Sequence, residues 1–344
     1  MNTQPNHQSL SGPALPRAVL TAAATVALLV FLAAASAAWA KGSDTMEEQL
    51  YVTSDYTHPG EFTGGIEGPA CDAQGNLYAV NYARQGTIGK VTPKGELSVF
   101  VELPSGSIGN GIRFDSHGAM LIADYTGHNV LRVDMQTRQV SVYAHEEAMN
   151  QPNDLAIGAN DLVYASDPNW GQDTGQLWRA NLDGTTTLLD GAMGTTNGIE
   201  VSPDGSTLYV NESVQRKVWA FDLSQAGQIS NKRLLIEARD LGVDGMRCDV
   251  DGNLYIARFG EGVVAKVSPG GEVLVEVALT GRNPSNIAFG GPDGRTCYVT
   301  VADRGCIETF RVEAPGRSWQ LFEQRKVPAR SQTWGAAKQG LQER

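Results

Sequence analysis

Hydrophobic and polar positions alternate in short runs along most of this chain, and one pattern of runs recurs six times. Each copy has an alternating run, a turn rich in Gly, Asp or Asn, and a second run rich in Leu, Tyr, Val and Ile, as in a β-hairpin. Successive copies start 43, 43, 44, 47 and 41 residues apart. They read EGPACDAQGNLYAV from Glu67, NGIRFDSHGAMLIAD from Asn110, NDLAIGANDLVYASD from Asn153, NGIEVSPDGSTLYVNE from Asn197, DGMRCDVDGNLYIA from Asp244 and SNIAFGGPDGRTCYVTV from Ser285.

A third apolar run follows each hairpin, and most copies add a fourth, such as SVFVEL at 98–103 or VSVYAH at 140–145. Four antiparallel strands in about 40 to 45 residues, repeated six times, predict an all-β protein with one six-bladed β-propeller over residues 41–324. The constant period argues against a sandwich or a solenoid. Either residues 49–55 or residues 318–324 are expected to supply the strand that closes the last blade, and the sequence leaves both open.

The two ends of the chain differ from the repeats. Residues 18–40 carry no charge, follow Arg17, and end in Ala-Trp-Ala, so residues 1–40 are predicted to be a signal peptide. An uncleaved membrane anchor is the second interpretation, because this segment is long enough to span a bilayer. Either interpretation predicts an extracytoplasmic protein, periplasmic or secreted. Residues 325–344 are polar, without a repeat, and are expected to form a tail.

The net charge limits the partners that this protein can bind, and the cysteine spacing limits the role of disulfides. The chain has 38 acidic and 27 basic residues, a net charge of −11 at pH 7, which argues against a nucleic-acid partner. Membrane contact is expected only if the N-terminal segment stays attached, and we expect a monomer. The four cysteines are too scattered for a disulfide scaffold, so buried thiols are predicted.

The first residue of every copy offers a side-chain oxygen. Sixfold repetition places these residues on one ring around the axis, and the residues two and four positions further on are mostly apolar. Because a strand alternates its faces, each polar residue leads an apolar face at the mouth of the central channel. The ring consists of Glu67, Asn110, Asn153, Asn197, Asp244 and Ser285.

This ring predicts a cation site. Two carboxylates confined with several amides would repel each other or stay unpaired, and a divalent ion would neutralise Glu67 and Asp244 together. Oxygen donors without His or Cys favour Ca²⁺, although other divalent metals can substitute. The alternative is a water-filled channel in which the acids are only solvated.

Several phrases together resemble the family of senescence marker protein (regucalcin), gluconolactonase and luciferin-regenerating enzyme. The resemblance implies a six-bladed propeller with one catalytic calcium ion, acting mostly on lactones, with a related branch that cleaves organophosphate fluorides. It covers residues 61 to about 312. The phrases are EGPACD at 67–72, PNDLAI at 152–157 with SDPNWG at 166–171, NGIEVSPDGSTLYVNES at 197–213, DGMRCDVDGNLYIAR at 244–258 and NIAFGGPDGRTCYVT at 286–300.

The resemblance also assigns roles to single residues. Glu67 and Asn197 look like metal ligands of the family, and Asp244 looks like its aspartate ligand and candidate general base. Asn153 looks like the asparagine that either binds the metal or holds the substrate beside it. Gln151 departs from the pattern, because the sugar-lactone members closest to the animal protein have arginine there.

Topology predicts which loops surround the metal. Innermost strands start at the ring and second strands return to it, so the loops between second and third strands lie there. Tyr125, Trp170 and Arg258 are the predicted substrate contacts, and Asn110 is expected to help orient the ester. Other residues of these loops are Tyr82, His128, Asn211, Glu212, Phe259, Asp303 and Arg304.

These observations favour a calcium-dependent hydrolase of a small lactone or ester, in which Asp244 accepts a proton from water. A nucleophilic triad is disfavoured, because the chain has no Gly-x-Ser-x-Gly phrase and its histidines fall outside the ring. Two alternatives stay open. One is a non-catalytic, calcium-stabilised scaffold, and the lesser one is an organophosphate-type hydrolase on the same site.

Overall fold

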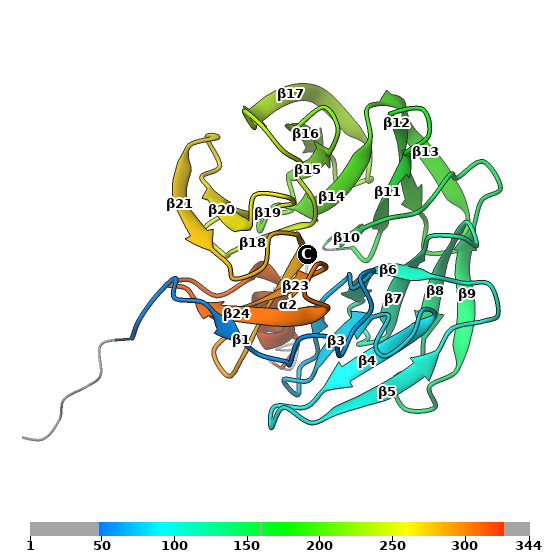
Figure 1. Cartoon of the computed structure of the whole chain (residues 1–344). Coiled ribbons are helices and arrows are strands. Elements are labelled where there is room, and N and C mark those ends of the chain that lie inside the picture. The colour runs from blue at the N-terminus through cyan, green and yellow to red at the C-terminus, as the bar shows by residue number, and fades with distance from the viewer. Residues whose placement is uncertain (1–47, 159, 327–344) are drawn as a thin grey trace, which may run out of the picture. The chain divides into compact units, whose positions relative to one another are not determined.

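The structure is a computed structural model that describes residues 48–158 and 160–326. From Leu50 onward it forms six four-stranded antiparallel sheets, arranged as the blades of a β-propeller (Figure 1). The predicted fold class is therefore confirmed. In these ranges no helix is both long and apolar enough to cross a membrane. The predicted signal segment and most of the predicted tail lie outside the described residues.

Blades 1 to 5 each consist of four strands that follow one another in the chain, with the first strand innermost, whereas blade 6 combines β22, β23 and β24 with β1. Blade 1 has β2 (Ala70–Cys71), β3 (Leu77–Val80), β4 (Thr87–Val91) and β5 (Leu97–Glu102); blade 2 has β6 (Gly109–Phe114), β7 (Met120–Asp124), β8 (Asn129–Val133) and β9 (Val140–His145); blade 3 has β10 (Leu155–Ile157), β11 (Val163–Asn169), β12 (Thr174–Ala180) and β13 (Thr186–Met193). Blade 4 has β14 (Thr196–Val201), β15 (Thr207–Glu212), β16 (Lys217–Leu223) and β17 (Ile229–Glu237); blade 5 has β18 (Met246–Cys248), β19 (Leu254–Arg258), β20 (Val263–Val267) and β21 (Val273–Ala278); blade 6 has β22 (Pro284–Gly290), β23 (Thr296–Val301), β24 (Cys306–Arg311) and β1 (Ser54–Asp55).

Burial falls from the inner to the outer strands. Every residue of β14, β18 and β22 is buried, whereas most residues of β17 and β21 are exposed or half-buried. Six clusters of buried side chains form the core, and each cluster joins two neighbouring blades. The blades therefore stabilise one another face to face, because a single blade cannot bury its own apolar faces.

The hairpin turns show why the repeated phrases fold as they do. Asp72 Oδ1 accepts hydrogen bonds from the backbone N–H groups of Gln74 and Asn76, both at 2.9 Å. The intervening Gly75 has a φ of 81°, a conformation that costs glycine little and other residues more. The equivalent Asp249 and Gly252 of blade 5 repeat this geometry. In blades 1 and 5 the Asp-x-x-Gly-Asn phrase thus encodes the turn that leads from the first strand back to the ring along the second.

The N-terminal segment closes the propeller. Strand β1 pairs antiparallel with β24, Ser54 opposite Thr309 and Asp55 opposite Glu308. Blade 6 therefore takes its outermost strand from the start of the described chain, which answers the question that the sequence left open. Arg304 stabilises the pairing of β1 with β24, because its guanidinium lies 2.5 Å from Asp55 Oδ1 and 2.7 Å from Glu308 Oε1.

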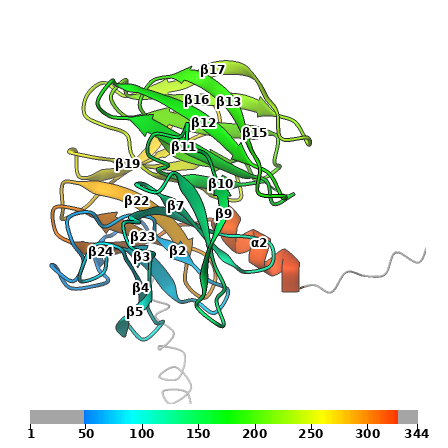
Figure 2. The same ribbon diagram turned by 90° about the vertical axis from the view of Figure 1, so that its right-hand side faces the viewer.

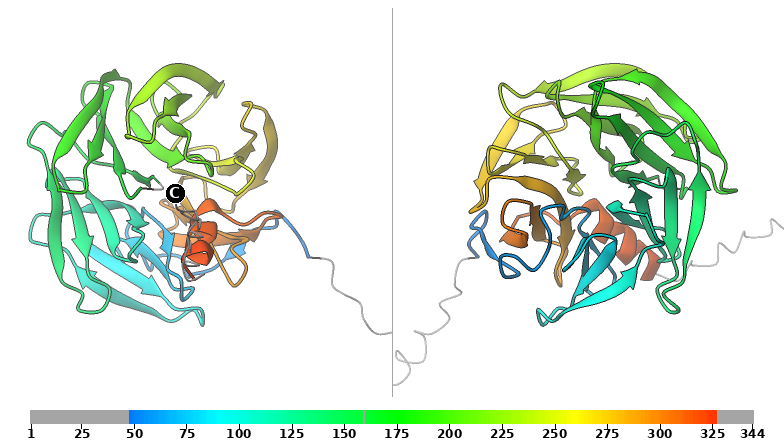
Figure 3. Two further views of the ribbon diagram at one scale, coloured as in Figure 1. Left: turned by 180° about the vertical axis from the view of Figure 1, so that it is seen from behind. Right: turned by 45° about the vertical axis from the view of Figure 1, so that its right-hand side comes forward.

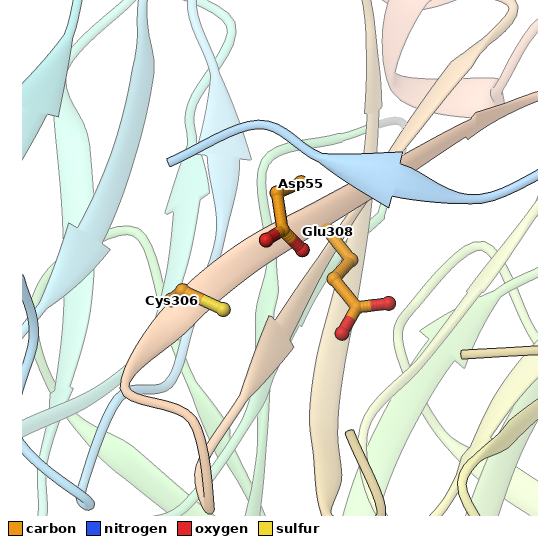
Figure 4. A group of neighbouring side chains, drawn as sticks. All are labelled: Asp55, Cys306 and Glu308. Atoms are coloured by element: carbon orange, nitrogen blue, oxygen red, sulfur yellow. The ribbon is translucent and has the colours of Figure 1, made fainter. Parts of the chain in front are cut away.

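Asp55, Glu308 and Cys306 form a compact cluster of potential metal ligands (Figure 4). Both carboxylates already pair with the guanidinium of Arg304, and the buried Glu308 also accepts hydrogen bonds from the backbone N–H groups of Thr280 and Gly281. The cluster is therefore an ion pair that holds the closing strand. All four cysteines are free and buried, as predicted.

Residues 318–324 do not form a strand, so the alternative prediction for this segment is wrong. They belong to helix α2 (Arg317–Lys326), whose Trp319 and Phe322 lie three positions apart, as side chains on one helical face do. Helix α2 contacts β22 and lies at the end of the innermost strands opposite the ring (Figure 2 and Figure 3). Arg317 enters the channel there and lies 3.4 Å from Glu200.

Candidate functional site

Five of the six ring residues line one cavity at the start of the innermost strands, and its volume is about 680 Å³. Asn110 and Asn197 lie within β6 and β14, whereas Asn153, Glu67 and Asp244 each precede the first strand of their blade. The sixth residue, Ser285, does not line the cavity. It is buried and donates a hydrogen bond to the Ile66 carbonyl at 2.8 Å. The pseudo-sixfold ring is thus a five-member site.

Two amide oxygens in this ring lack hydrogen-bond partners. Asn110 Oδ1 and Asn197 Oδ1 are buried, and neither is hydrogen-bonded to any residue that the structure describes. The orientation of Asn197 is fixed, because its Nδ2 donates to Ser213 Oγ at 3.0 Å, and Ser213 in turn donates to the Val243 carbonyl at 2.5 Å. Buried acceptors without partners are rare in proteins and point to a bound ion or water.

Glu67 and Asp244 bring two carboxylates into the same cavity wall. Burial raises the pKa of Glu67 to about 7, and the negative charge of Asp154 adds to this, against hydrogen bonds from the Gly68 N–H and the Asn286 amide. Burial also raises the pKa of Asp244 well above its usual range, and the charge of Glu67 raises it further. Each acid therefore makes ionisation of the other more costly, which a bound cation would relieve.

The donor set fits a hard divalent cation. Its groups are two carboxylates and three amides, all of which offer oxygen, and the cavity lining contains neither His nor Cys. Carboxylate and amide oxygens are the ligands that Ca²⁺ takes in proteins, in a flexible geometry with six to eight donors. The unpartnered Asn110 and Asn197 oxygens and the opposed acids support the same fit.

A buried ion-pair cluster lies directly behind the ring. Asp154 is fully buried, and its carboxylate lies 3.0 Å from both Arg113 and Arg247. Burial opposes its ionisation, but the two guanidinium groups hold the pKa of Asp154 below its usual value. Asn286 Nδ2 joins the cluster to the site, because it donates to Glu67 at 3.0 Å and lies 3.4 Å from Asp154.

The residue after each ring member explains how this cluster fits. It is glycine in four blades, and a Cβ atom at Gly111 or Gly245 would lie about 2 Å from the side chains of Asp154 and Asn286 respectively. Blades 3 and 6 have Asp154 and Asn286 at this position. The glycines therefore make room on the axis for two polar side chains, a pattern that the aligned copies contain but that the sequence prediction missed.

Two of the predicted substrate contacts lie in the cavity lining. Tyr125 and Trp170 come from loops between second and third strands, and both line it. Arg258 does not, so its prediction as a cavity residue is wrong. It pairs with Glu261 at 2.7 Å in a separate groove, while the next residue, Phe259, lines the cavity. The physical reason is strand alternation, which turns neighbouring side chains to opposite sides.

The sequence prediction also missed several lining residues, among them Val214, Arg216 and Leu241. Val214 and Arg216 lie in the turn between β15 and β16, and Leu241 lies in the connection between blades 4 and 5. The topological argument did identify the first of these loops, but it singled out Asn211 and Glu212 within it. Tyr82, another loop residue, packs against Phe62 instead, with ring centroids 5.3 Å apart.

The fold and the site together define a class of protein: a β-propeller in which five blades contribute oxygen donors to one central cavity. The chain belongs to the SMP-30/gluconolactonase/LRE-like family, whose model matches residues 66–303. A gluconolactonase of Zymomonas mobilis is 27% identical over 272 residues, which are 69% of this chain and 76% of that protein. A 6-deoxy-6-sulfogluconolactonase of Pseudomonas putida is 34% identical over 164 residues, 43% of this chain and 56% of that protein.

Solved structures show the same fold. A calcium-binding protein, regucalcin, from Agrobacterium tumefaciens aligns with a TM-score of 0.67 and 22% identity, over 78% of this chain and 95% of that one. A gluconolactonase from Xanthomonas campestris aligns with a TM-score of 0.67 and 20% identity, over 76% and 89% of the two chains. At these identities the similarity establishes the propeller alone.

Proposed function

We propose that this protein is a calcium-dependent hydrolase of a small lactone or ester. The observation that carries the proposal is the convergence of Glu67, Asp244 and three asparagines on one cavity, with two buried amide oxygens left without partners. A scaffold without a bound cation would gain nothing from two acids in its channel, and a calcium-stabilised scaffold would bind the cation without hydrolysing a lactone. Family membership and lactonases among the relatives support the same reaction class.

Glu67, Asn153, Asn197 and Asp244 would hold the cation, with Asn286 and the Gly68 N–H fixing the Glu67 carboxylate by hydrogen bonds of 3.0 and 2.8 Å. When bound, the cation supplies Lewis acidity that polarises the carbonyl of the substrate. The backbone of Asp244 is fixed as well, because its N–H donates to Ala257 at 2.9 Å and its carbonyl accepts from Asn211 at 2.5 Å.

The other steps of the reaction, proton transfer and substrate orientation, depend on side chains of the cavity. The Asp244 carboxylate accepts a proton from the attacking water, and Asn153 and Asn110 orient the ester group by hydrogen bonds. Tyr125 and Trp170 contact the body of the substrate at the rim. Hydrolysis opens the lactone to a hydroxy acid, and the proton held by Asp244 is available for the leaving alkoxide.

An organophosphate hydrolase is the second candidate. A diisopropyl-fluorophosphatase of Loligo vulgaris is 25% identical over 294 residues, which are 76% of this chain and 93% of that protein. A cation ringed by oxygen donors suits a phosphoryl oxygen as well as a carbonyl oxygen. We rank the lactone first because the relatives include several lactonases of different sugars.

An extracytoplasmic location is proposed from residues 18–40, whose uncharged run and Ala-Trp-Ala end fit a signal peptide. N-terminal sequencing of the mature protein tests this. A start near Lys41 would support export with cleavage, and retention of residues 18–40 would indicate an anchor.

A substrate panel tests the proposed function. Purified protein is expected to hydrolyse γ- or δ-lactones, to lose at least about 100-fold in rate after chelation, and to recover when calcium is returned. Release of acid reports lactone opening, and release of fluoride reports the second candidate. Hydrolysis of a fluorophosphate but no lactone would favour the second candidate, and no turnover of either would favour the scaffold.

A further inference from the structure

The mouth of the cavity is apolar. Trp170, Leu241 and Phe259 are 37, 46 and 39% exposed to solvent. Exposed apolar side chains that gather at one place are typical of a binding site. These three residues come from blade 3, from the connection between blades 4 and 5, and from blade 5, so the apolar character extends around much of the rim. Apolar walls with a few polar groups are typical of small-molecule sites. The apolar and aromatic side chains that line the cavity are Ile108, Tyr125, Trp170, Val214, Leu241, Val243 and Phe259.

Arg216 is the one lysine or arginine among the described residues that line this cavity. Its Nε is buried without a hydrogen bond, and its guanidinium has no ion pair with any described residue. The backbone at Arg216 is fixed, since its N–H donates to Ser213 at 3.2 Å and its carbonyl accepts from Ala238 at 2.8 Å. The preceding residue, Gln215, accepts a hydrogen bond from the Thr195 N–H at 2.8 Å and donates one to the Asp173 carbonyl at 2.9 Å. Arg216 is thus a cation on a fixed stretch of backbone, without an ion-pair partner in the part of the chain that the structure describes.

Charge balance indicates what this cation binds. A divalent ion bound by the ring would cancel the two charges of Glu67 and Asp244, and Arg216 would then leave the cavity with one uncompensated positive charge. A half-buried guanidinium without an anion is costly, and Arg binds carboxylates and similar oxyanions through two parallel hydrogen bonds. A substrate with one anionic group would satisfy it.

We propose that the substrate is a lactone or ester with an apolar body and one carboxylate-like anionic group, and that Arg216 binds this group while the apolar rim covers the body. The inference rests on the proposed function, which supplies the ester bond and the cation. It makes Arg216 a specificity-determining residue, remote from the bond that breaks.

Two matched substrates test the proposal: a γ-lactone with a 4-carboxyphenyl group and the same lactone with a 4-carbamoylphenyl group. The wild-type protein is expected to prefer the carboxylate by about 10- to 100-fold in kcat/KM, mostly through KM. Arg216→Gln should remove this preference and leave kcat/KM for the carboxamide within about twofold. Arg216→Lys should keep part of the preference, because it keeps the charge without the planar fork.

Arg239→Gln is the matched control, because Arg239 is exposed, lies in a different groove and undergoes the same change of charge. It should leave both substrates unaffected. Equal losses on both substrates in Arg216→Gln, with an unchanged melting temperature, would place Arg216 at the reaction centre and overturn the inference. Equal kcat/KM for both substrates in the wild type would overturn it too.

Calorimetry on calcium-loaded protein separates this inference from the proposed function. If neither lactone is hydrolysed, the proposed function fails, and the two compounds are then compared as ligands. Tighter binding of the carboxylate that Arg216→Gln abolishes would still support the anion site. Equal affinities, or no binding of either compound, would contradict it.

Discussion

Replacing Asp244 by Asn should lower kcat for lactone hydrolysis by about 10²- to 10⁴-fold, the range that a general base contributes. The amide keeps an oxygen that can face the cation, so calcium should still bind when its concentration is raised. It cannot accept the proton of the attacking water. The loss should therefore persist at saturating calcium, in kcat measured after a full calcium titration.

Glu67→Gln is the matched comparison, because it also removes one negative charge from the ring and keeps an oxygen. Glu67 is fixed by Gly68 and Asn286 and has no proton-transfer role in our account. We expect its calcium affinity to fall about 10- to 100-fold and its turnover to approach the wild-type value in excess calcium. Recovery of Asp244→Asn under the same conditions would show that another group takes the proton.

Asp154→Asn should destabilise the protein by about 3 to 5 kcal/mol, because it removes the one carboxylate that, among the described residues, pairs with the two buried arginines Arg113 and Arg247. Arg113 and Arg247 would then face each other, in a site where burial and the Arg247 charge already lower the pKa of Arg113 to about 10. The melting temperature should fall by roughly 5 to 15 °C. Thermal unfolding followed by circular dichroism measures this.

Asp222→Asn is the control for this prediction. Asp222 pairs with Arg233 at 2.6 Å, but about half of each side chain is exposed, and exposed ion pairs contribute little. Its melting temperature should stay close to that of the wild type. Equal shifts for the two variants would mean that the cluster behind the ring adds no more stability than a surface pair.

The fold could be predicted from the sequence because it repeats. One hairpin phrase with its polar turn is ambiguous alone, but six copies at nearly constant spacing leave only a propeller. The closing strand could not be predicted. Residues 49–55 and 318–324 have similar apolar content, and the choice depends on long-range contacts such as that of Arg304 with Asp55.

The ring could also be predicted, since equivalent positions in a repeat must lie on one circle, and five of its six members do line one cavity. Which residues of the loops line the cavity could not be predicted. Whether Arg258 or Phe259 turns inward depends on where β19 ends, which the sequence gives only to within a residue or two. Arg216 stands in a turn with a φ of 59°, a conformation that the sequence did not reveal.

A calcium titration of metal-stripped protein, followed for bound calcium and for lactone turnover in the same samples, tests the central claim most directly. That claim is that the oxygen ring holds one divalent cation on which hydrolysis depends. We predict that turnover rises in proportion to bound calcium and reaches its plateau as the ring site fills with one ion per chain. Full turnover without bound metal, or calcium binding that leaves turnover at zero for every lactone, would contradict the account.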